Sequence, residues 1–176
     1  THLKQLNDKR LAQNLPPFFT RIGINTGTAF IGNLGTNERM DYTAIGDCVN
    51  LASRLQNLNK IYHTKILIGE DTKTELASAF VLRPLDIVEV RGKKNTTKIY
   101  ELIGTLSKDP DTQASPEQIE LASLFTSAYN TYEQQALVSA KTQFQSIQAK
   151  FPDYQPPQLY LERLSSGAPP HTPPKD

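Results

Sequence analysis

The sequence predicts an α/β domain, in finer terms α+β, that is followed by a helical extension. Between residues 18 and 104, short alternating apolar runs typical of strands are interspersed with stretches in which apolar residues recur at helical spacing. Five of the nine glycines lie between Gly23 and Gly46, as expected where strands and tight turns follow one another. After Gly104 the composition changes, because nine of the twelve prolines lie there.

The pattern predicts each element of the domain in turn. Residues 1–17 indicate the end of a helix that closes at two successive prolines. A long helix is favoured over residues 48–62, where Leu51, Leu55 and Leu58 fall on one stripe. The other predicted elements are a strand at 18–27, hairpin arms at 28–31 and 41–45, a strand at 65–68, a helix at 70–80, and strands at 81–90 and 97–103 joined by a turn at 92–95.

The remainder of the chain predicts a polar linker over residues 105–115, a helical hairpin over 116–164 and a disordered tail over 165–176. Ser115 is followed by Pro116 and then by Gln118, which is the pattern of a capping box at a helix start. The two amphipathic helices resemble a single tetratricopeptide unit. One unit cannot bury both of its faces, so we expect it to pack on the α/β domain or on a partner, and a peptide-binding repeat is the alternative.

A candidate site lies at the start of the long helix. Gly46 can end a preceding strand, and Asp47 is a suitable N-cap residue for the helix that follows. Asn50 and Arg54 are four residues apart, so they project from one flank near the helix start. An amide and a guanidinium beside a helix N-terminus form a good anion site, although a chance polar face is the simpler interpretation of this helix taken alone.

Three segments together carry a family resemblance. They are Arg21-Ile22-Gly23-Ile24-Asn25-Thr26-Gly27, Ile31-Gly32-Asn33-Leu34-Gly35 and the run from Asp41 to Arg54. In content and order they resemble the catalytic domain of class III adenylate and guanylate cyclases, over roughly residues 1–104. The resemblance implies a partial ferredoxin-like nucleotide cyclase fold that lacks its N-terminal strands. It also implies attack of the ribose 3′-hydroxyl of ATP or GTP on the α-phosphorus, at a site shared by two cyclase domains.

The resemblance assigns roles to five residues. Asn50 would orient the ribose, and Arg54 would stabilise the charge that develops at the α-phosphate. Thr43 falls where the family selects the purine, and a hydroxyl there favours ATP and an adenylate cyclase. Lys93 resembles a second phosphate contact, and Arg39 lies near a further triphosphate-binding position.

The family's two Mg²⁺ or Mn²⁺ ions are bound by two aspartates in segments that would precede this sequence, so no residue here is assigned as a metal ligand. We therefore expect the chain to be the C-terminal part of a cyclase domain, inactive by itself, within an intact parent that is an adenylate cyclase and a homodimer. A natural start at Thr1 would instead favour a non-catalytic regulatory or scaffolding subunit. A guanylate cyclase is the other alternative.

Composition limits the partners. A net charge of +1 argues against nucleic acid as a partner. No apolar run approaches the roughly 20 residues of a membrane span, so we expect no membrane contact from this segment, while an anchor elsewhere in the parent stays open. The single cysteine, Cys48, cannot form an internal disulfide and is typical of a cytoplasmic protein.

Overall fold

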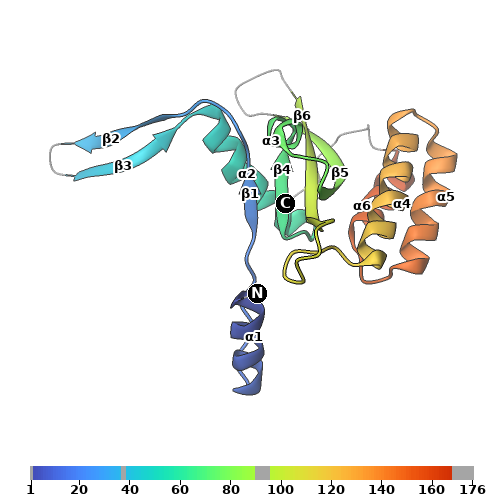
Figure 1. Ribbon diagram of the computed structural model, residues 1–176. Coiled ribbons are helices and arrows are strands. Elements are labelled where there is room, and N and C mark those ends of the chain that lie inside the picture. Colours follow the sequence, from blue (N-terminus) through green and yellow to red (C-terminus); the bar gives the residue numbers. More distant parts are fainter. Residues whose placement is uncertain (1, 37–38, 90–95, 168–176) are drawn as a thin grey trace.

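The computed structural model describes residues 2–36, 39–89 and 96–167 (Figure 1). Strands are interspersed with helices as far as β6 and only helices follow in the described residues, which confirms the α/β class with a helical extension. The elements are α1 (His2–Ala12), β1 (Ile22–Ile24), β2 (Phe30–Thr36), β3 (Arg39–Ile45), α2 (Asp47–Ile61), β4 (Ile66–Gly69), α3 (Glu70–Glu75), β5 (Phe80–Glu89), β6 (Thr96–Thr105), α4 (Pro116–Glu133), α5 (Leu137–Lys150) and α6 (Pro156–Ser166).

The strands form two separate sheets. Four of them make one sheet in the order β1-β4-β6-β5, in which β1 is parallel to β4 and the other neighbours are antiparallel. β2 and β3 pair only with each other, in register from Phe30↔Ile45 to Thr36↔Arg39. Figure 1 shows this hairpin arm reaching away from the four-stranded sheet. The arm leads directly into α2, so the chain passes from an exposed hairpin to a helix packed on the sheet.

Several elements differ from the sequence prediction. The strand predicted at 18–27 forms only over Ile22–Ile24, and the hairpin arm predicted at 28–31 runs over Phe30–Thr36. The helix predicted at 70–80 ends at Glu75, and Thr74 Oγ1 donates to Asp71 O (2.8 Å), a local bond that competes with the helical ladder. A third helix, α6, follows α5 in the described residues, whereas the pattern predicted a hairpin of two. α6 begins at Pro156 and Pro157, and prolines are favourable in the first helical turn. The turn predicted at 92–95 and most of the predicted tail, 168–176, lie outside the described residues.

α2 packs directly against β1 because Gly23 places no side chain between them. A Cβ atom on Gly23 would lie 2.1 Å from Ala52 O and 2.4 Å from Gln56 N, well inside contact distance. Asn59, which is 1% exposed, ties the same helix to the sheet, since its Nδ2 donates to Ile22 O (2.9 Å). These contacts fix the position of α2 relative to the central strands.

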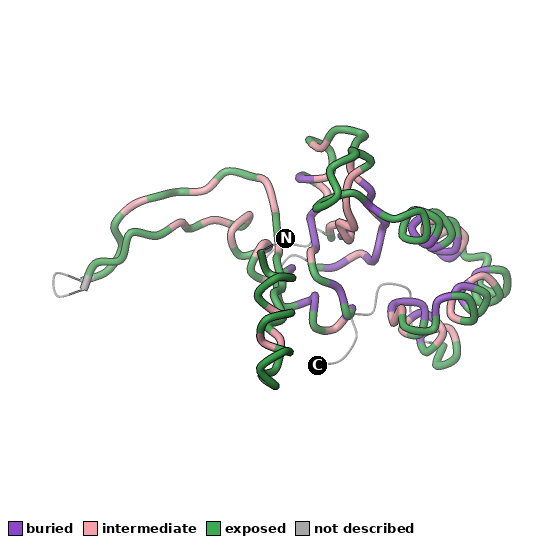
Figure 2. Tube along the Cα trace, turned by 60° about the horizontal axis from the view of Figure 1, so that its bottom comes forward, coloured by how far each residue is buried: buried purple, intermediate pink, exposed green. Residues whose placement is uncertain are grey.

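The C-terminal helices pack beside β5 and share one core with the sheet. α4 begins with the predicted capping box, in which Gln118 N donates to Ser115 Oγ (3.2 Å) and Ser115 N donates to Gln118 Oε1 (2.8 Å). One cluster of buried residues includes Leu55 of α2, Leu85 of β5 and Tyr160 of α6. Figure 2 shows this buried interior in purple between the sheet and the helices. The helical unit of α4, α5 and α6 is therefore part of the same folded body as the sheet.

Large apolar side chains stay exposed mainly on α1, the segment after it and the hairpin arm, which are largely green in Figure 2. α1 has no buried residue. An extended apolar surface of this kind is typical of a region that contacts another polypeptide. The residues are Leu3, Leu6, Leu11, Leu15, Phe18, Phe19, Ile22, Ile24, Phe30, Ile31, Leu34, Met40, Tyr42 and Ile45. Among the described helices, none combines the length and the apolar character needed to cross a membrane.

The close approach of β1 and α2 generates a first prediction. Gly23→Ala is expected to destabilise the fold by about 1–3 kcal/mol, because the added methyl group meets the backbone of α2. Gly32→Ala, on the hairpin arm with nothing within 4 Å of its Cβ position, is the matched control and is expected to change stability by less than about 0.5 kcal/mol. Urea unfolding midpoints of the two variants measure the difference. Equal midpoints would mean that α2 does not lie this close to β1.

Candidate functional site

Helix α2 presents Asn50 and Arg54 on one exposed flank. The apolar stripe of the helix, Leu51, Leu55 and Leu58, is buried against the sheet, and this orientation leaves Asn50 exposed and Arg54 half-buried. Within the described part of the chain, Arg54 has no acidic side chain at ion-pair distance. The structure therefore brings the two predicted catalytic side chains together, with a guanidinium that is available to an incoming anion.

The start of α2 differs from the prediction in one respect. Gly46, and not Asp47, occupies the N-cap position, and no side chain caps the helix. The amide nitrogens of Val49 and Asn50 both donate to Gly46 O (3.1 Å each), so the first helical turn is closed by the backbone. Asp47 is the first helical residue, where a carboxylate interacts favourably with the positive end of the helix dipole.

The other residues predicted to contact the substrate do not lie on α2. Thr43 lies on β3 opposite Gly32, and its side chain is exposed on the hairpin arm a few residues before α2. Arg39 is the first residue of β3, opposite Thr36. Lys93 lies outside the described residues. The structure thus places Asn50 and Arg54 on one helix, and Thr43 on the strand that leads into it.

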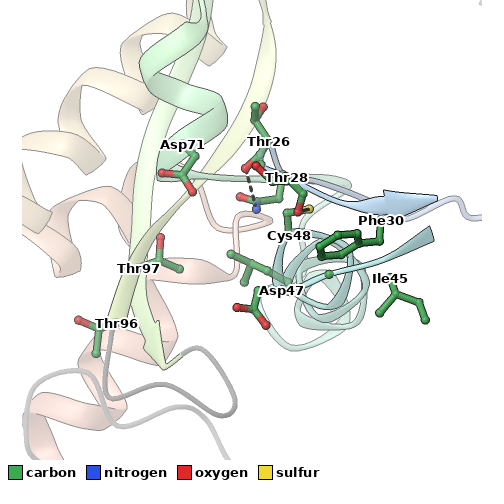
Figure 3. A pocket seen from close by; sticks show the side chains of 13 residues that line it. Thr26, Thr28, Phe30, Ile45, Asp47, Cys48, Asp71, Thr96 and Thr97 are labelled. Carbon is green, nitrogen blue, oxygen red and sulfur yellow. Dashed lines mark hydrogen bonds between the residues drawn. The ribbon is translucent and has the colours of Figure 1, made fainter.

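A cavity of about 700 Å³ opens beside the start of α2, and no sequence pattern predicted it (Figure 3). Its lining includes the loop after β1, the first turn of α2, Asp71 of α3 and Thr96 and Thr97 of β6. Cys48 Sγ donates to Thr28 O (3.1 Å) in its wall. Asn50, Arg54 and Thr43 are not among its lining residues. The cavity therefore borders the start of α2 without being lined by the predicted catalytic side chains.

Two pairs of ionisable side chains lie in the interior of the fold, on β5, β6 and the end of α2. Arg83 Nε and Nη2 both donate to Glu101 Oε2 (2.9 and 2.6 Å) across β5 and β6. Burial raises the pKa of the Glu101 carboxyl, and the Arg83 guanidinium opposes this rise. Tyr62, the residue that ends α2, donates its hydroxyl to Asp86 Oδ2, and burial followed by the Asp86 charge raises the pKa of Tyr62. Sequence reasoning missed these residues, because each pair joins strands or helices far apart in the chain.

The described residues do not fit a metal site. Across residues 2–36, 39–89 and 96–167, no group of three or more His, Cys, Asp or Glu side chains is arranged so that it could hold a metal ion. The Asn50 amide and the Arg54 guanidinium are donors that can bind an anionic group.

Comparisons with known proteins agree with this fold. The family model "Adenylate and Guanylate cyclase catalytic domain" matches residues 2–104. Adenylate cyclase 1 of Rhizobium meliloti is 39% identical over 112 residues, and the terminal-differentiation-specific adenylate cyclase of Dictyostelium discoideum is 34% identical over 147 residues. These alignments cover 64% and 82% of this chain, but only 17% and 7% of the two relatives. The crystal structure of the adenylyl cyclase CyaB from P. aeruginosa superposes with a TM-score of 0.51 at 34% identity, over 61% of this chain and 54% of that one.

The four-stranded sheet, the hairpin arm and the polar flank of α2 define a nucleotide cyclase domain. The chain belongs to the family of adenylate and guanylate cyclase catalytic domains, as the resemblance in its sequence predicts. Proteins of this family are generally metal-dependent, and their cyclase domains act as dimers on a nucleotide substrate.

The wall of the cavity generates a second prediction. A Cβ atom on Gly27 would lie 2.7 Å from Cys48 Cβ, so Gly27→Ala must displace the first turn of α2. Because Cys48 is the only cysteine, a thiol reagent reports on this turn alone. We expect the thiol to react several-fold faster in Gly27→Ala than in the unchanged protein. Gly32→Ala is the control with open space around its Cβ position, and equal rates in all three proteins would contradict the contact.

Proposed function

We propose that this chain supplies one half of the active site of an adenylate cyclase, which converts ATP into cyclic AMP and pyrophosphate. A second cyclase domain, most simply another copy of the same protein, supplies the other half. One observation carries the proposal: α2 buries its apolar stripe and leaves Asn50 and Arg54 together on an exposed flank, with no described acidic partner for Arg54.

In the proposed reaction the ribose 3′-oxygen of ATP forms a bond to the α-phosphorus and releases its proton to solvent water. The bond between the α-phosphorus and the bridging oxygen breaks, and pyrophosphate leaves with the electron pair of that bond. Negative charge gathers on the phosphoryl oxygens in the transition state, so positioning and electrostatic stabilisation dominate the catalysis.

The two residues on α2 have separate tasks in this proposal. Asn50 donates to or accepts from the ribose and holds the 3′-oxygen in line with the phosphorus. Arg54 donates from its planar guanidinium to the α-phosphate oxygens, and the charge that develops there strengthens these hydrogen bonds. Because α2 is held on the sheet by Gly23 and Asn59, both side chains start from a rigid backbone.

Base selection is assigned to Thr43. Its hydroxyl can accept a hydrogen bond from the adenine amino group, which guanine lacks at that position. Lys93 and Arg39 are proposed to contact the triphosphate, as the resemblance implies. The relatives from Rhizobium meliloti and Dictyostelium discoideum are named adenylate cyclases, which supports ATP as the substrate.

The resemblance also implies two Mg²⁺ or Mn²⁺ ions. The described residues do not bring together ligands for these ions. We expect residues 1–176 assayed alone to be inactive, so cyclase activity is to be measured on the protein expressed from its complete open reading frame.

The exposed hairpin arm supports the shared site. Phe30 and Tyr42 are 81% and 76% exposed on this arm, and Ile31 and Met40 are also exposed. Burying such side chains against a second cyclase domain is favourable by roughly 25 cal/mol for each Å² of apolar surface. A dimer that uses the arm would also bring a second chain next to the start of α2.

Replacing Arg54 tests the proposal. Arg54→Ala is expected to lower kcat on the order of 100- to 1,000-fold with a much smaller change in KM, because a preorganised donor to the transition state is lost. Lys60→Ala removes an exposed cation from the far end of the same helix and is the matched control. Near-normal turnover in Arg54→Ala would overturn the proposal. No cyclase activity in the unchanged protein would favour a non-catalytic subunit.

Replacing Thr43 tests the choice of base. Thr43→Val keeps the shape of the side chain but removes its hydroxyl, and the ratio of kcat/KM for ATP to that for GTP is expected to fall about 10-fold. Tyr42→Phe removes a hydroxyl from the neighbouring exposed residue of the arm and serves as the control. An unchanged ratio would mean that another residue selects the purine. A preference for GTP in the unchanged protein would identify a guanylate cyclase.

A further inference from the structure

Asp86 is a buried carboxylate at a bulge in β5. The strand register shifts between Pro84 and Asp86, so that Leu85 is an extra residue opposite β6. Pro84 fits this position because it has no amide hydrogen to donate, and β5 is the edge strand of the sheet. Bulges re-aim the side chains next to them, and this one leaves Leu85 and Asp86 both buried, with Asp86 1% exposed.

The Asp86 carboxylate joins two helices that are far apart in the sequence. Its Oδ2 accepts from the hydroxyl of Tyr62, the residue that ends α2, and from Arg163 Nη2 of α6 (2.6 Å). Its Oδ1 accepts from Ile87 N (2.8 Å). Arg163 is only 7% exposed, and although burial opposes its charged form, the Asp86 carboxylate raises the pKa of Arg163 above its ordinary value.

Further contacts hold the C-terminal helices to the same bulge. The hydroxyl of Tyr160, one turn before Arg163 on α6, donates to Leu85 O. The Arg83 guanidinium lies 3.8 Å from the ring centroid of Tyr154, in the connection between α5 and α6. The helical unit of α4, α5 and α6 is thus fixed to β5 by directed polar contacts in addition to apolar packing.

A buried ion pair of this kind adds little net stability, because desolvation of the charges offsets their attraction. What it does impose is geometry, since a buried carboxylate left without one donor is strongly unfavourable. The end of α2 and the middle of α6 must therefore hold fixed positions around the same oxygen. α2 is a continuous helix, and Arg54 lies eight residues before Tyr62, or roughly 12 Å along the axis. A tilt at Tyr62 moves the flank that carries Asn50 and Arg54.

We propose that Arg163, acting through Asp86 and Tyr62, is a positioning residue for the cyclase reaction, and that the helical unit of α4, α5 and α6 sets the orientation of α2. This inference rests on the proposed function of Asn50 and Arg54. The similarity to the Dictyostelium discoideum cyclase is consistent with a shared role for this unit. That alignment covers 82% of the chain, so it extends past residue 104, where the family match ends, into the C-terminal helices.

The test uses four variants of the protein expressed from its complete open reading frame. Arg163→Met keeps the aliphatic stem but removes the charge that faces Asp86. Tyr62→Phe keeps the ring and removes only the hydroxyl that joins α2 to Asp86. Lys150→Met is the matched control, because it breaks the exposed Lys150–Glu120 pair between α5 and α4, on a part of the helical unit that does not reach Asp86. For each variant kcat, KM and amide hydrogen exchange of α2 are measured.

Arg163→Met and Tyr62→Phe are each expected to lower kcat on the order of 10-fold at nearly constant KM, because the donors on α2 are displaced from the transition state. Amide exchange in α2 is expected to accelerate on the order of 10-fold, whereas Lys150→Met leaves both quantities unchanged. Arg163→Lys, which keeps the charge, is expected to recover part of kcat.

Other outcomes overturn the inference. If Arg163→Met and Tyr62→Phe only lower the melting temperature, with kcat and α2 exchange like those of Lys150→Met, the contacts are structural and do not position α2. If Arg163→Met fails to fold, the Tyr62→Phe result decides. Failure of the proposed function is recognised separately. Unchanged kcat in Arg54→Ala removes the catalytic role of that residue, while α2 exchange still shows whether the helical unit orients the helix.

Discussion

The close approach of α2 to β1 is the contact on which the rest of the structure depends. Residue 23 lies so near the helix backbone that only a hydrogen atom fits there, and Asn59 closes the same interface with a hydrogen bond to Ile22 O. A helix held this tightly cannot rotate about its own axis without breaking both contacts. The burial of its apolar stripe therefore determines which side chains stay accessible to solvent, and Asn50 and Arg54 are among them.

The far end of α2 is constrained in a different way. Tyr62 donates to the Asp86 carboxylate, which also accepts from Arg163 of α6. The first constraint is steric and comes from a neighbouring strand, whereas the second is electrostatic and comes from the C-terminal extension. Together they make the extension part of the support for α2, instead of an independent appendage.

Local features of the fold could be predicted from the sequence, and long-range ones could not. The helical stripe on α2 and the Ser115 capping box depend on residues within one or two turns, and both are present. The prediction that Asp47 is the N-cap residue of α2 was wrong, because the N-cap lies one residue earlier, at Gly46. α6 was missed because the prolines before it suggested an end, although prolines also favour a start. Asp86 and Arg163 are 77 residues apart, and no spacing pattern links them.

The distribution of aromatic rings gives the molecule a built-in optical reporter. The chain has no tryptophan and seven tyrosines, so tyrosine dominates its near-ultraviolet absorption and emission. Tyr160 is completely buried, and the ring centroids of Phe125, Tyr129, Tyr132 and Phe144 lie between 4.6 and 6.1 Å from its own. Rings held rigidly at such distances give strong near-ultraviolet circular dichroism, which disappears when they move freely. The junction between the sheet and the C-terminal helices can therefore be observed spectroscopically without any label.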